Sequence, residues 1–423
     1  MEFAQASRRK SMGGMRIAFW GNFGALNLGN ECTLAAAVGN IRARLPDAKL
    51  VAICRDPEDA ARRHGIAALP MSGRAAQPAD GRHYPRLLRI MGLVGREAAD
   101  WLRAFRHAST IDALLITGSG ILSDEGEGTL GLPYELFKWS LVCKLRGKRL
   151  FFVSVGAESL TRPISRAFVK GALRLADYRC YRDVHSAQLL QGIGFKNDRD
   201  VVRPDLAFSL PRPVAAANGA AMGESDSPPP GRVAVGVFNY RDRGQTNSAD
   251  AAAYQTYLDA ICSLIAWLLA RQYQVRVVIG DFRYDDAVRV DVRAELTRRG
   301  LDLTSSLFAD EPAASFEILL DQLCAVDFVI ATRYHNLILG LLLGKPVVSV
   351  SYEGKHEALM RTMGLADYCQ TIDDLDVKRL VDQFQRLEKN ADSLRAVIVE
   401  RVAASRASLD EQYELIVGSA CRR

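Results

Sequence analysis

Paired cysteines are missing from this sequence. Eight cysteines are spread over 423 residues, and no two of them form a CxxC pair. Disulfide frameworks and structural zinc sites need clustered or regularly spaced thiols, so this spacing argues against both. We therefore expect reduced, mostly buried cysteines, no metal site and a cytoplasmic location.

Long apolar segments are missing as well. The N-terminal residues lack the apolar stretch of a signal peptide, and residues 1–14 are predicted to be a disordered extension before a fold that starts at Met15. The longest apolar run, "NLILGLLLGKPVVSVSY", is interrupted by Lys345 and Pro346 and is too short to span a bilayer. A soluble protein is expected, attached to a membrane at most peripherally.

The charge has no strong bias. The net charge is +6, with 48% hydrophobic and 25% charged residues, as in ordinary globular proteins. The only basic run is "SRRK" at residues 7–10, and no RNA-binding or zinc-finger signature occurs. This mild positive charge suits anionic small molecules or an anionic membrane face, and nucleic-acid binding is not expected.

The sequence does contain a regular alternation of short apolar runs with helical stretches. The first series of runs is "RIAFW" (16–20), "KLVAIC" (49–54), "DALLIT" (112–117), "RLFFVSVG" (149–156) and "YRCYR" (178–182). The second is "RVAVGVF" (232–238), "QVRVVIG" (274–280), "DLTSSL" (302–307), "DFVIA" (327–331) and "KPVVSVSY" (345–352). Such alternation predicts an α/β protein with parallel sheets covered by helices on both faces.

One segment separates the two series. Residues 211–231 are rich in Pro, Gly, Ala and Ser, which predicts a linker. We therefore expect an N-terminal α/β domain (15–210), the linker, a C-terminal α/β domain (232–376) and a C-terminal helical segment (377–423). Ligands bind beyond the carboxyl ends of the strands in open α/β sheets, so the cleft between the domains is the predicted site.

The motif "GNFGALNLGNE" (21–31) directly follows the first predicted strand. Its glycines allow a sharp turn and a close approach of a ligand, and the next helix offers free N–H groups to an anion. The spacing is neither Walker A nor GxGxxG, so no nucleotide fingerprint applies, and a plain tight turn fits about equally well. The candidate ligand contacts here are Gly21, Asn22, Asn27 and Glu31.

Two further turns follow predicted strands of the first domain. Gly118, Ser119 and Gly120 end one strand, and we expect them at the edge of the cleft. Glu158 follows the next strand, where it could serve as a base or simply as an acid favoured at a helix start. Asp124 is more readily explained as a solvated acid.

The motif "YRDVHSAQLL" continues this series. Asp183 is a plausible helix N-cap and His185 is expected to be structural, whereas the role of Arg182 stays open.

The strongest signal lies in the second domain, in "ATRYHN" and the strand after it. Arg333 and His335 follow the run "DFVIA", and Tyr352 and Lys355 follow the next strand on the same edge of the sheet. Arginine offers a planar fork for carboxylate or phosphate, and histidine moves protons near neutral pH. The alternative is a structural arginine–carboxylate pair with a capping histidine. Asn336 completes the set of candidate ligand contacts.

From about Arg16 to Leu365, the sequence resembles the polysaccharide pyruvyl transferase family. The motifs that carry the resemblance occur in order: "GNFGALNLGNE", "ITGSGIL", "VSVGAESL", "YRDVHSAQLL", "RPDLAFSL" and "TRYHNLILGLLLGKPVVSVSYEGK". The resemblance implies a two-domain, GT-B-like fold. It also implies transfer of pyruvate from phosphoenolpyruvate to hydroxyls of a cell-surface glycan or its lipid-linked precursor as a ketal, with release of phosphate and no cofactor.

Within that resemblance, His335 and Arg333 are implied in the phosphoenolpyruvate site and are the expected catalytic pair. Phosphoenolpyruvate carries two anionic groups, so Lys355 and a third cation, for which Arg361 is the candidate, would share its binding. His335 is expected either to protonate the methylene carbon or to bind the phosphate as imidazolium. Glu31, Asp124 and Glu158 are the candidate bases.

Two other functions fit the same fold. A GT-B glycosyltransferase would bind a nucleotide-sugar, and its basic pair would hold the pyrophosphate. A non-catalytic glycan-binding protein would need neither Arg333 nor His335. The partners expected under the first reading are phosphoenolpyruvate and a glycan or lipid-linked oligosaccharide acceptor, met in the cytoplasm or at the inner face of the cell membrane.

Overall fold

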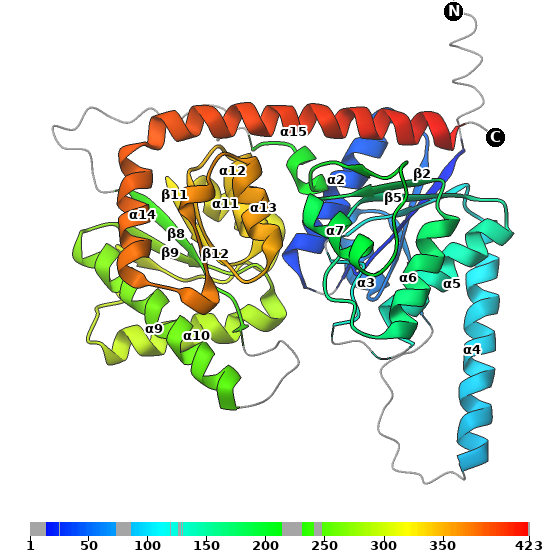
Figure 1. Ribbon diagram of the computed structural model, residues 1–423, viewed down its shortest axis with the longest axis horizontal. Coiled ribbons are helices and arrows are strands. Elements are labelled where there is room, and N and C mark those ends of the chain that lie inside the picture. Colours follow the sequence, from blue (N-terminus) through cyan, green and yellow to red (C-terminus); the bar gives the residue numbers. More distant parts are fainter. Residues whose placement is uncertain are drawn as a thin grey trace, which may run out of the picture.

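The computed structural model describes residues 14–24, 26–72, 86–118, 120–125, 128, 130–213, 231–240 and 248–421, with backbone alone for 86–91 and 248–250. Two α/β domains lie side by side under one long C-terminal helix (Figure 1). The predicted extension (1–14) and most of the predicted linker (211–231) fall outside the described residues.

The first domain is built on a parallel sheet with the strand order β3-β2-β1-β4-β5-β6-β7. Its central strand is buried from Ile17 onward, as expected for a parallel strand covered on both faces. The strands are β1 (Arg16–Trp20), β2 (Lys49–Cys54), β3 (Ala67–Pro70), β4 (Ala113–Ile116), β5 (Arg149–Val155), β6 (Tyr178–Tyr181) and β7 (Val201–Val202).

Local sequence signals set the helix ends in this domain. Asp56 caps α3 by accepting from the Asp59 N–H, Pro57 occupies its first position, and Gly65 ends it in the left-handed conformation. The helices are α2 (Leu28–Arg44), α3 (Pro57–His64), α4 (Arg86–Ser109), α5 (Leu132–Leu145), α6 (Pro163–Leu175), α7 (Val184–Gly192) and the short 3-10 helix η1 (Leu206–Ser209).

The second domain repeats the plan, with the parallel strand order β10-β9-β8-β11-β12-β13. The predicted strand at 302–307 is wrong: Asp302 accepts hydrogen bonds from the N–H and hydroxyl of Thr304, which closes a turn, and the strand starts only at Phe308. The strands are β8 (Arg232–Gly236), β9 (Gln274–Val278), β10 (Phe308–Ala309), β11 (Phe328–Ala331), β12 (Val347–Ser351) and β13 (Cys369–Thr371).

The helices of the second domain include one that is apolar enough to cross a membrane by length and composition, at residues 251–270 of α9. More than half of that segment is buried against the domain, as in a core helix of a globular protein. The helices are α9 (Ser248–Ala270), α10 (Phe282–Arg298), α11 (Phe316–Cys324), α12 (Tyr334–Leu342), α13 (Gly354–Thr362), η3 (Ala366–Tyr368), η4 (Ile372–Asp374), α14 (Val377–Lys389) and α15 (Ala391–Ala420).

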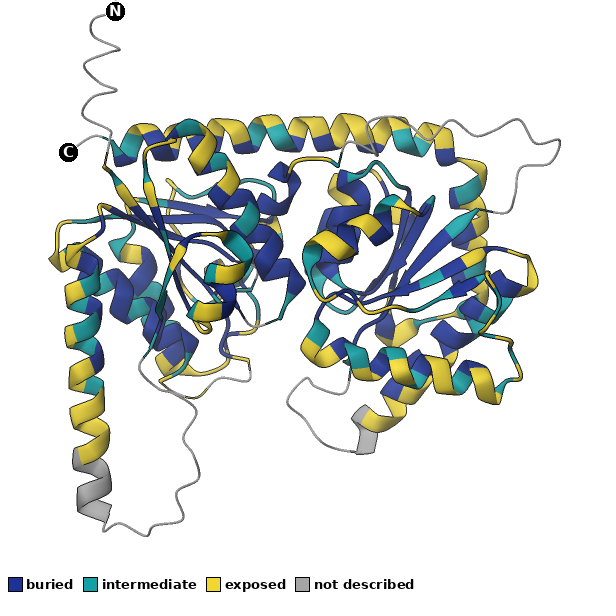
Figure 2. Ribbon diagram, turned by 180° about the vertical axis from the view of Figure 1, so that it is seen from behind, coloured by how far each residue is buried: buried dark blue, intermediate teal, exposed yellow. Residues whose placement is uncertain are grey.

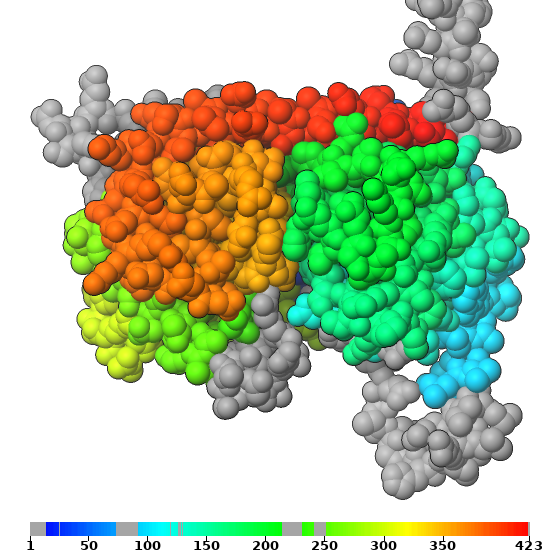
Figure 3. Space-filling model, in the orientation of Figure 1, coloured from blue at the N-terminus to red at the C-terminus, as the bar shows by residue number. Residues whose placement is uncertain are grey.

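Helix α15 belongs to both domains. It starts beside the second domain and runs back over the first, where Gln412 accepts from the Ser154 hydroxyl at 3.0 Å (Figures 1 and 3). Its Arg406 donates to the Phe208 and Leu210 carbonyls, and its Tyr413 is fully buried. One apolar core therefore continues from the first sheet through α2, η1, α12 and α15 into the second domain, as the buried facing surfaces in Figure 2 show.

Both sheets have the strand order of a Rossmann-type fold, which confirms the predicted fold class. In each sheet the order reverses next to the first strand, between β1 and β4 and between β8 and β11. Ligands of open α/β sheets bind beyond the carboxyl ends of strands at such a reversal. A ligand is therefore expected near the loops after β1 and β4 and the start of α12 after β11.

Candidate active site

His335 lies in the first turn of α12, at the point where the two domains touch. Its ring packs against Gly29 in the first turn of α2, where a Cβ atom would come within 2.1 Å of the imidazole Nδ1. Its Nε2 is buried without a hydrogen-bond partner among the described residues and lies 3.8 Å from the Asp205 carboxylate. Burial, only partly offset by Asp205, lowers the pKa of His335 to about 4, so the ring is neutral near pH 7.

Arg333, the N-cap residue of α12, is committed to a carboxylate. Its Nε and Nη2 donate to the two oxygens of Asp285 at 2.7 and 2.6 Å, and the guanidinium stacks on the Phe238 ring at 4.4 Å. Asp285 is fully buried and also accepts from backbone N–H groups of the neighbouring loops. The structural arginine–carboxylate pair raised as an alternative is thus present, and it fixes the loop on which His335 sits.

Lys355 crosses from the second domain to the first. Its ammonium lies 2.7 Å from Glu158 and 2.6 Å from Glu353, although only 6% of its side chain is exposed. Burial disfavours the charge on Glu158, but Lys355 and Arg182 outweigh it and lower the pKa of that carboxyl to about 2. So low a pKa makes Glu158 a poor proton acceptor and suits it to holding cations.

Arg182 completes this cluster, and sequence reasoning had left its role open. It follows β6, is almost completely buried, and donates to Asp183 at 3.1 Å and to Glu158 at 3.4 Å. Its guanidinium also lies 3.7 Å from Asp205 and stacks over the Tyr334 ring at 4.7 Å. Two cations, Arg182 and Lys355, therefore converge beside His335.

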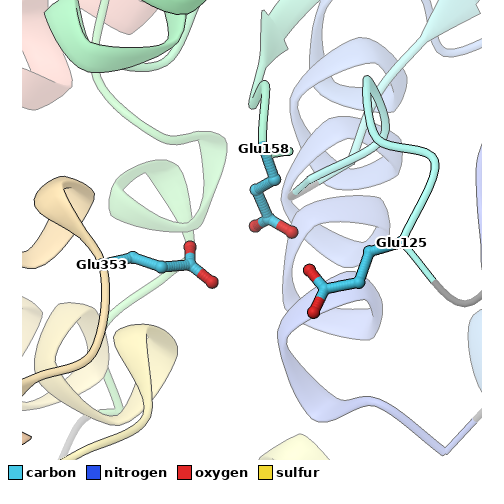
Figure 4. Close-up of side chains that lie close together, drawn as sticks. All are labelled: Glu125, Glu158 and Glu353. Carbon is cyan, nitrogen blue, oxygen red and sulfur yellow. The ribbon is translucent and has the colours of Figure 1, made fainter. Parts of the chain in front are cut away.

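Glu125, Glu158 and Glu353 place carboxylate oxygens within 4.8 Å of one another (Figure 4). They come from different loops, two in the first domain and one in the second. The Lys355 ammonium already contacts two of the three. The group is therefore a partly compensated anionic patch at the domain junction.

The aromatic residues after β8 and β12 form the wall of this region. Tyr352 stacks on Phe238 with ring centroids 4.3 Å apart and nearly parallel planes. His356 is fully buried, and its Nε2 lies 2.9 Å from the Thr332 carbonyl. Arg361 lies exposed in the last turn of α13, at the opposite end of that helix from Lys355, so the expectation that it joins the cation cluster is wrong.

In the loop after β1, the predicted contacts serve mostly as internal structure. Asn27 caps α2 by accepting from the Gly29 and Asn30 N–H groups, and it donates to Asp281 of the second domain at 3.0 Å. Glu31 is 1% exposed, accepts from the Gly24 N–H at 2.8 Å and lies 2.7 Å from the His64 ring. Its carboxylate is therefore used inside the loop, which weighs against its expected role as base.

The glycines of these loops are set by space and by conformation. A Cβ at Gly21 would lie 2.6 Å from the Thr117 carbonyl. Gly118 and Gly120 have φ of 132° and 69°, and the Glu158 carboxylate lies against Gly120. Ser119 lies outside the described residues.

Asp124 turns inward, away from any role in the cleft. It accepts from the backbone N–H groups of Thr161 and Arg162 at 3.0 and 2.8 Å. Burial opposes the charge on Asp124, but these hydrogen bonds prevail and lower its pKa. Asp124 therefore holds the loop before α6, and its surroundings suit a structural carboxylate rather than a base.

Buried polar atoms without partners gather at the carboxyl ends of both sheets. Asn336 is fully buried, and neither its amide nitrogen nor its amide oxygen has a hydrogen-bond partner among the described residues. The Asn22 amide oxygen is in the same state, as is His335 Nε2. Such groups are rare in native proteins and cluster at sites that bind ligands.

Asp205 and Asp285 are site residues that sequence reasoning did not single out. Asp285 pairs with a residue 48 positions away, and Asp205 faces a histidine from the other domain. Asp205 lies in "RPDLAFSL", one of the motifs that carry the family resemblance, and that motif is the one signal by which it could have been found.

Two Rossmann-type domains that meet across such a junction define a GT-B-type protein. HepE from Anabaena, solved with UDP and glucose, is similar in structure with a TM-score of 0.58 at 13% identity, over 96% of this chain and 100% of that one. UDP-GlcNAc 2-epimerase from Neisseria meningitidis follows at 0.56 and 10% identity, over 97% and 100%. A glycosyltransferase from Rickettsia africae also scores 0.56, at 11% identity, over 96% and 99%. Such likenesses establish the fold.

The family is established separately from the sequence. A model of the polysaccharide pyruvyl transferase family matches residues 27–354, and the chain belongs to that family. The matched range includes both faces of the domain junction, from Asn27 in the first domain to Gly354 in the second. No curated protein matches the chain in a sequence comparison.

Proposed function

We propose that this protein transfers pyruvate from phosphoenolpyruvate to two hydroxyls of a cell-surface glycan as a cyclic ketal, releasing phosphate. The observation that carries the proposal is the position of His335. A titratable ring with a buried Nε2 that lacks a partner among the described residues lies beside two convergent cations at the junction of two domains. Together with the family membership, this arrangement supports a site for a small dianion that must be protonated.

The donor would be held by the cations of this junction. Phosphate and carboxylate are bound well by arginine forks and ammonium groups, and both kinds are present in Arg182 and Lys355. In the structure these cations are paired with Glu158, Glu353 and Asp183. The donor's anionic groups would therefore compete with these carboxylates for the same cations.

The proton chemistry follows from the state of His335. The neutral ring cannot protonate carbon, but a bound phosphate would supply the negative charge that burial withholds and would raise its pKa. The imidazolium then gives its proton to the methylene carbon, and C2 accepts the oxygen of the first hydroxyl, whose proton returns to the ring. When the second hydroxyl attacks C2, the C2–O bond to phosphate breaks, and its proton leaves with the phosphate.

Acceptor and location are part of the same proposal. The loops after β1 and β4 face the junction from the first domain and would bind the sugar. A lipid-linked oligosaccharide is the proposed acceptor, which places the protein in the cytoplasm with peripheral attachment to the inner face of the membrane. No cofactor is needed, because phosphoenolpyruvate supplies both the transferred group and the leaving group.

Thermal unfolding distinguishes the proposed donor from its main rival. Phosphoenolpyruvate should raise the melting temperature, because a ligand that binds only the folded state stabilises it by mass action. UDP-sugars should leave it unchanged. Protection by a UDP-sugar without protection by phosphoenolpyruvate would indicate a glycosyltransferase. If neither protects and no phosphate is released with any glycan acceptor, the catalytic proposal fails.

Two variants divide the labour of the pair. His335→Ala should abolish phosphate release while the protein still unfolds cooperatively, and near-normal turnover would remove the histidine from the mechanism. Arg333→Ala should weaken donor binding but also destabilise the protein, because it leaves the buried Asp285 carboxylate unpaired. The double variant Arg333→Ala/Asp285→Asn restores charge balance, so a binding defect that persists in it belongs to the loss of Arg333.

A further inference from the structure

Helix α4 extends beyond the body of the first domain. Figures 1 and 2 show its N-terminal half running past the ends of α5 and α6, with no other helix or strand of the described chain beside it. All residues from 92 to 96 are exposed there, including Leu93 at 55% and Val94 at 64%. Leu102, further along the helix, is 50% exposed. An isolated helix that leaves large apolar side chains in water normally has a partner.

The charges of α4 are divided between its two halves. Its acidic residues, Glu97 and Asp100, face the domain, where the buried Lys138 ammonium lies 3.7 and 3.3 Å from them. The projecting part, "RLLRIMGLVGR" (86–96), contains three arginines and no acidic residue. The end of the helix that stands clear of the protein is therefore both apolar and positively charged.

We infer that the projecting half of α4 is a membrane-docking element that inserts Leu93 and Val94 into an anionic bilayer surface. A basic helix with apolar residues lies in the interface of such a membrane, held by buried apolar area and by attraction to anionic lipid headgroups. Charge complementarity favours a lipid surface over a second copy of this chain, because two copies would bring the same arginines together. The inference rests on the membrane association proposed above and gives it a location.

Flotation with lipid vesicles tests this with the full-length chain. Vesicles of phosphatidylglycerol and phosphatidylcholine should carry the protein, vesicles of phosphatidylcholine alone should carry less, and added salt should weaken the binding. Leu93→Asp combined with Val94→Asp should lower binding about tenfold or more, because charged groups replace the inserted side chains. Val290→Asp is the matched control, since Val290 is 51% exposed on α10, and it should bind like the wild type.

The outcomes are separable from those of the transfer reaction. If the wild type binds and the double variant binds equally well, α4 is not the docking element. If the wild type binds no vesicle, both the membrane association and the role of α4 are wrong. A dimer in vesicle-free solution that the double variant abolishes would mean that a second copy covers this face. Phosphate release with a short water-soluble acceptor should be the same in wild type and variant, whichever way flotation turns out.

Discussion

Replacing Gly29 with alanine tests whether the position of His335 is set by the contact between the two domains. A Cβ at Gly29 would lie 2.1 Å from the imidazole Nδ1, whereas ordinary contacts begin near 3.4 Å. The ring must therefore move by about 1.3 Å, or the two helix ends must separate by a similar amount. Crowding of this kind typically costs about 1–3 kcal/mol. A displacement of about 1 Å in a reacting group can lower turnover on the order of 100-fold.

The same helix supplies the control. Gly39 lies in α2, and a Cβ added there would have nothing within 4 Å, so Gly39→Ala should only improve helix propensity, by about 0.5–1 kcal/mol. Phosphate release and thermal unfolding are measured for both variants, and the imidazole pKa of His335 is followed by NMR. We expect Gly29→Ala to lose turnover and to melt lower, while Gly39→Ala melts slightly higher with normal turnover.

The refuting result is specific. If Gly29→Ala keeps wild-type turnover and an unchanged His335 pKa, while its stability changes as in Gly39→Ala, then the ring is not confined by α2. In that case the domain contact at this point has no role in positioning the histidine.

Two further predictions concern buried charge. Because the pKa of His335 is lowered to about 4, the unfolded chain takes up a proton near pH 6.5 that the folded chain does not, so this contribution to stability is complete above pH 6.5 and is lost as the pH falls toward 4. Denaturant unfolding of wild type and His335→Gln across that range should differ by up to about 3 kcal/mol, and parallel curves would contradict the lowered pKa. Lys138→Met should lower stability by about 3–5 kcal/mol, because it leaves Glu97, Asp100 and Glu135 without their buried cation; a loss below about 1 kcal/mol would show that water reaches them.

The alternation of apolar runs was enough to predict both sheets, because strands buried on two faces leave continuous apolar sequence such as "RLFFVSV". It was not enough at the edge, where "DLTSSL" has strand-like spacing but Asp302 closes a turn. His335 and Lys355 could be selected because polar residues directly after a buried strand must lie at the ligand edge of a parallel sheet. Their placement at the junction, beside Asp205 and Glu158, could not be predicted, since both partners come from the other domain.

The state of each charge was also beyond sequence reasoning. Arg333 follows its strand as an anion-binding residue would, yet Asp285, 48 residues earlier, takes its fork. Which carboxylate pairs with a cation depends on the packing of α10 against the loop after β8. A local sequence pattern holds no information about that contact.

Helix α15 has a consequence for how the protein is made. The first domain depends on residues 391–420 for part of its wall, including the buried Tyr413 and the hydrogen bond between Gln412 and Ser154. During synthesis these residues leave the ribosome last, so a nascent first domain stays open on one side while the whole second domain is translated. The domain that is synthesised first is thus completed last, and a chain that ends prematurely before α15 would expose apolar surface on both domains at once.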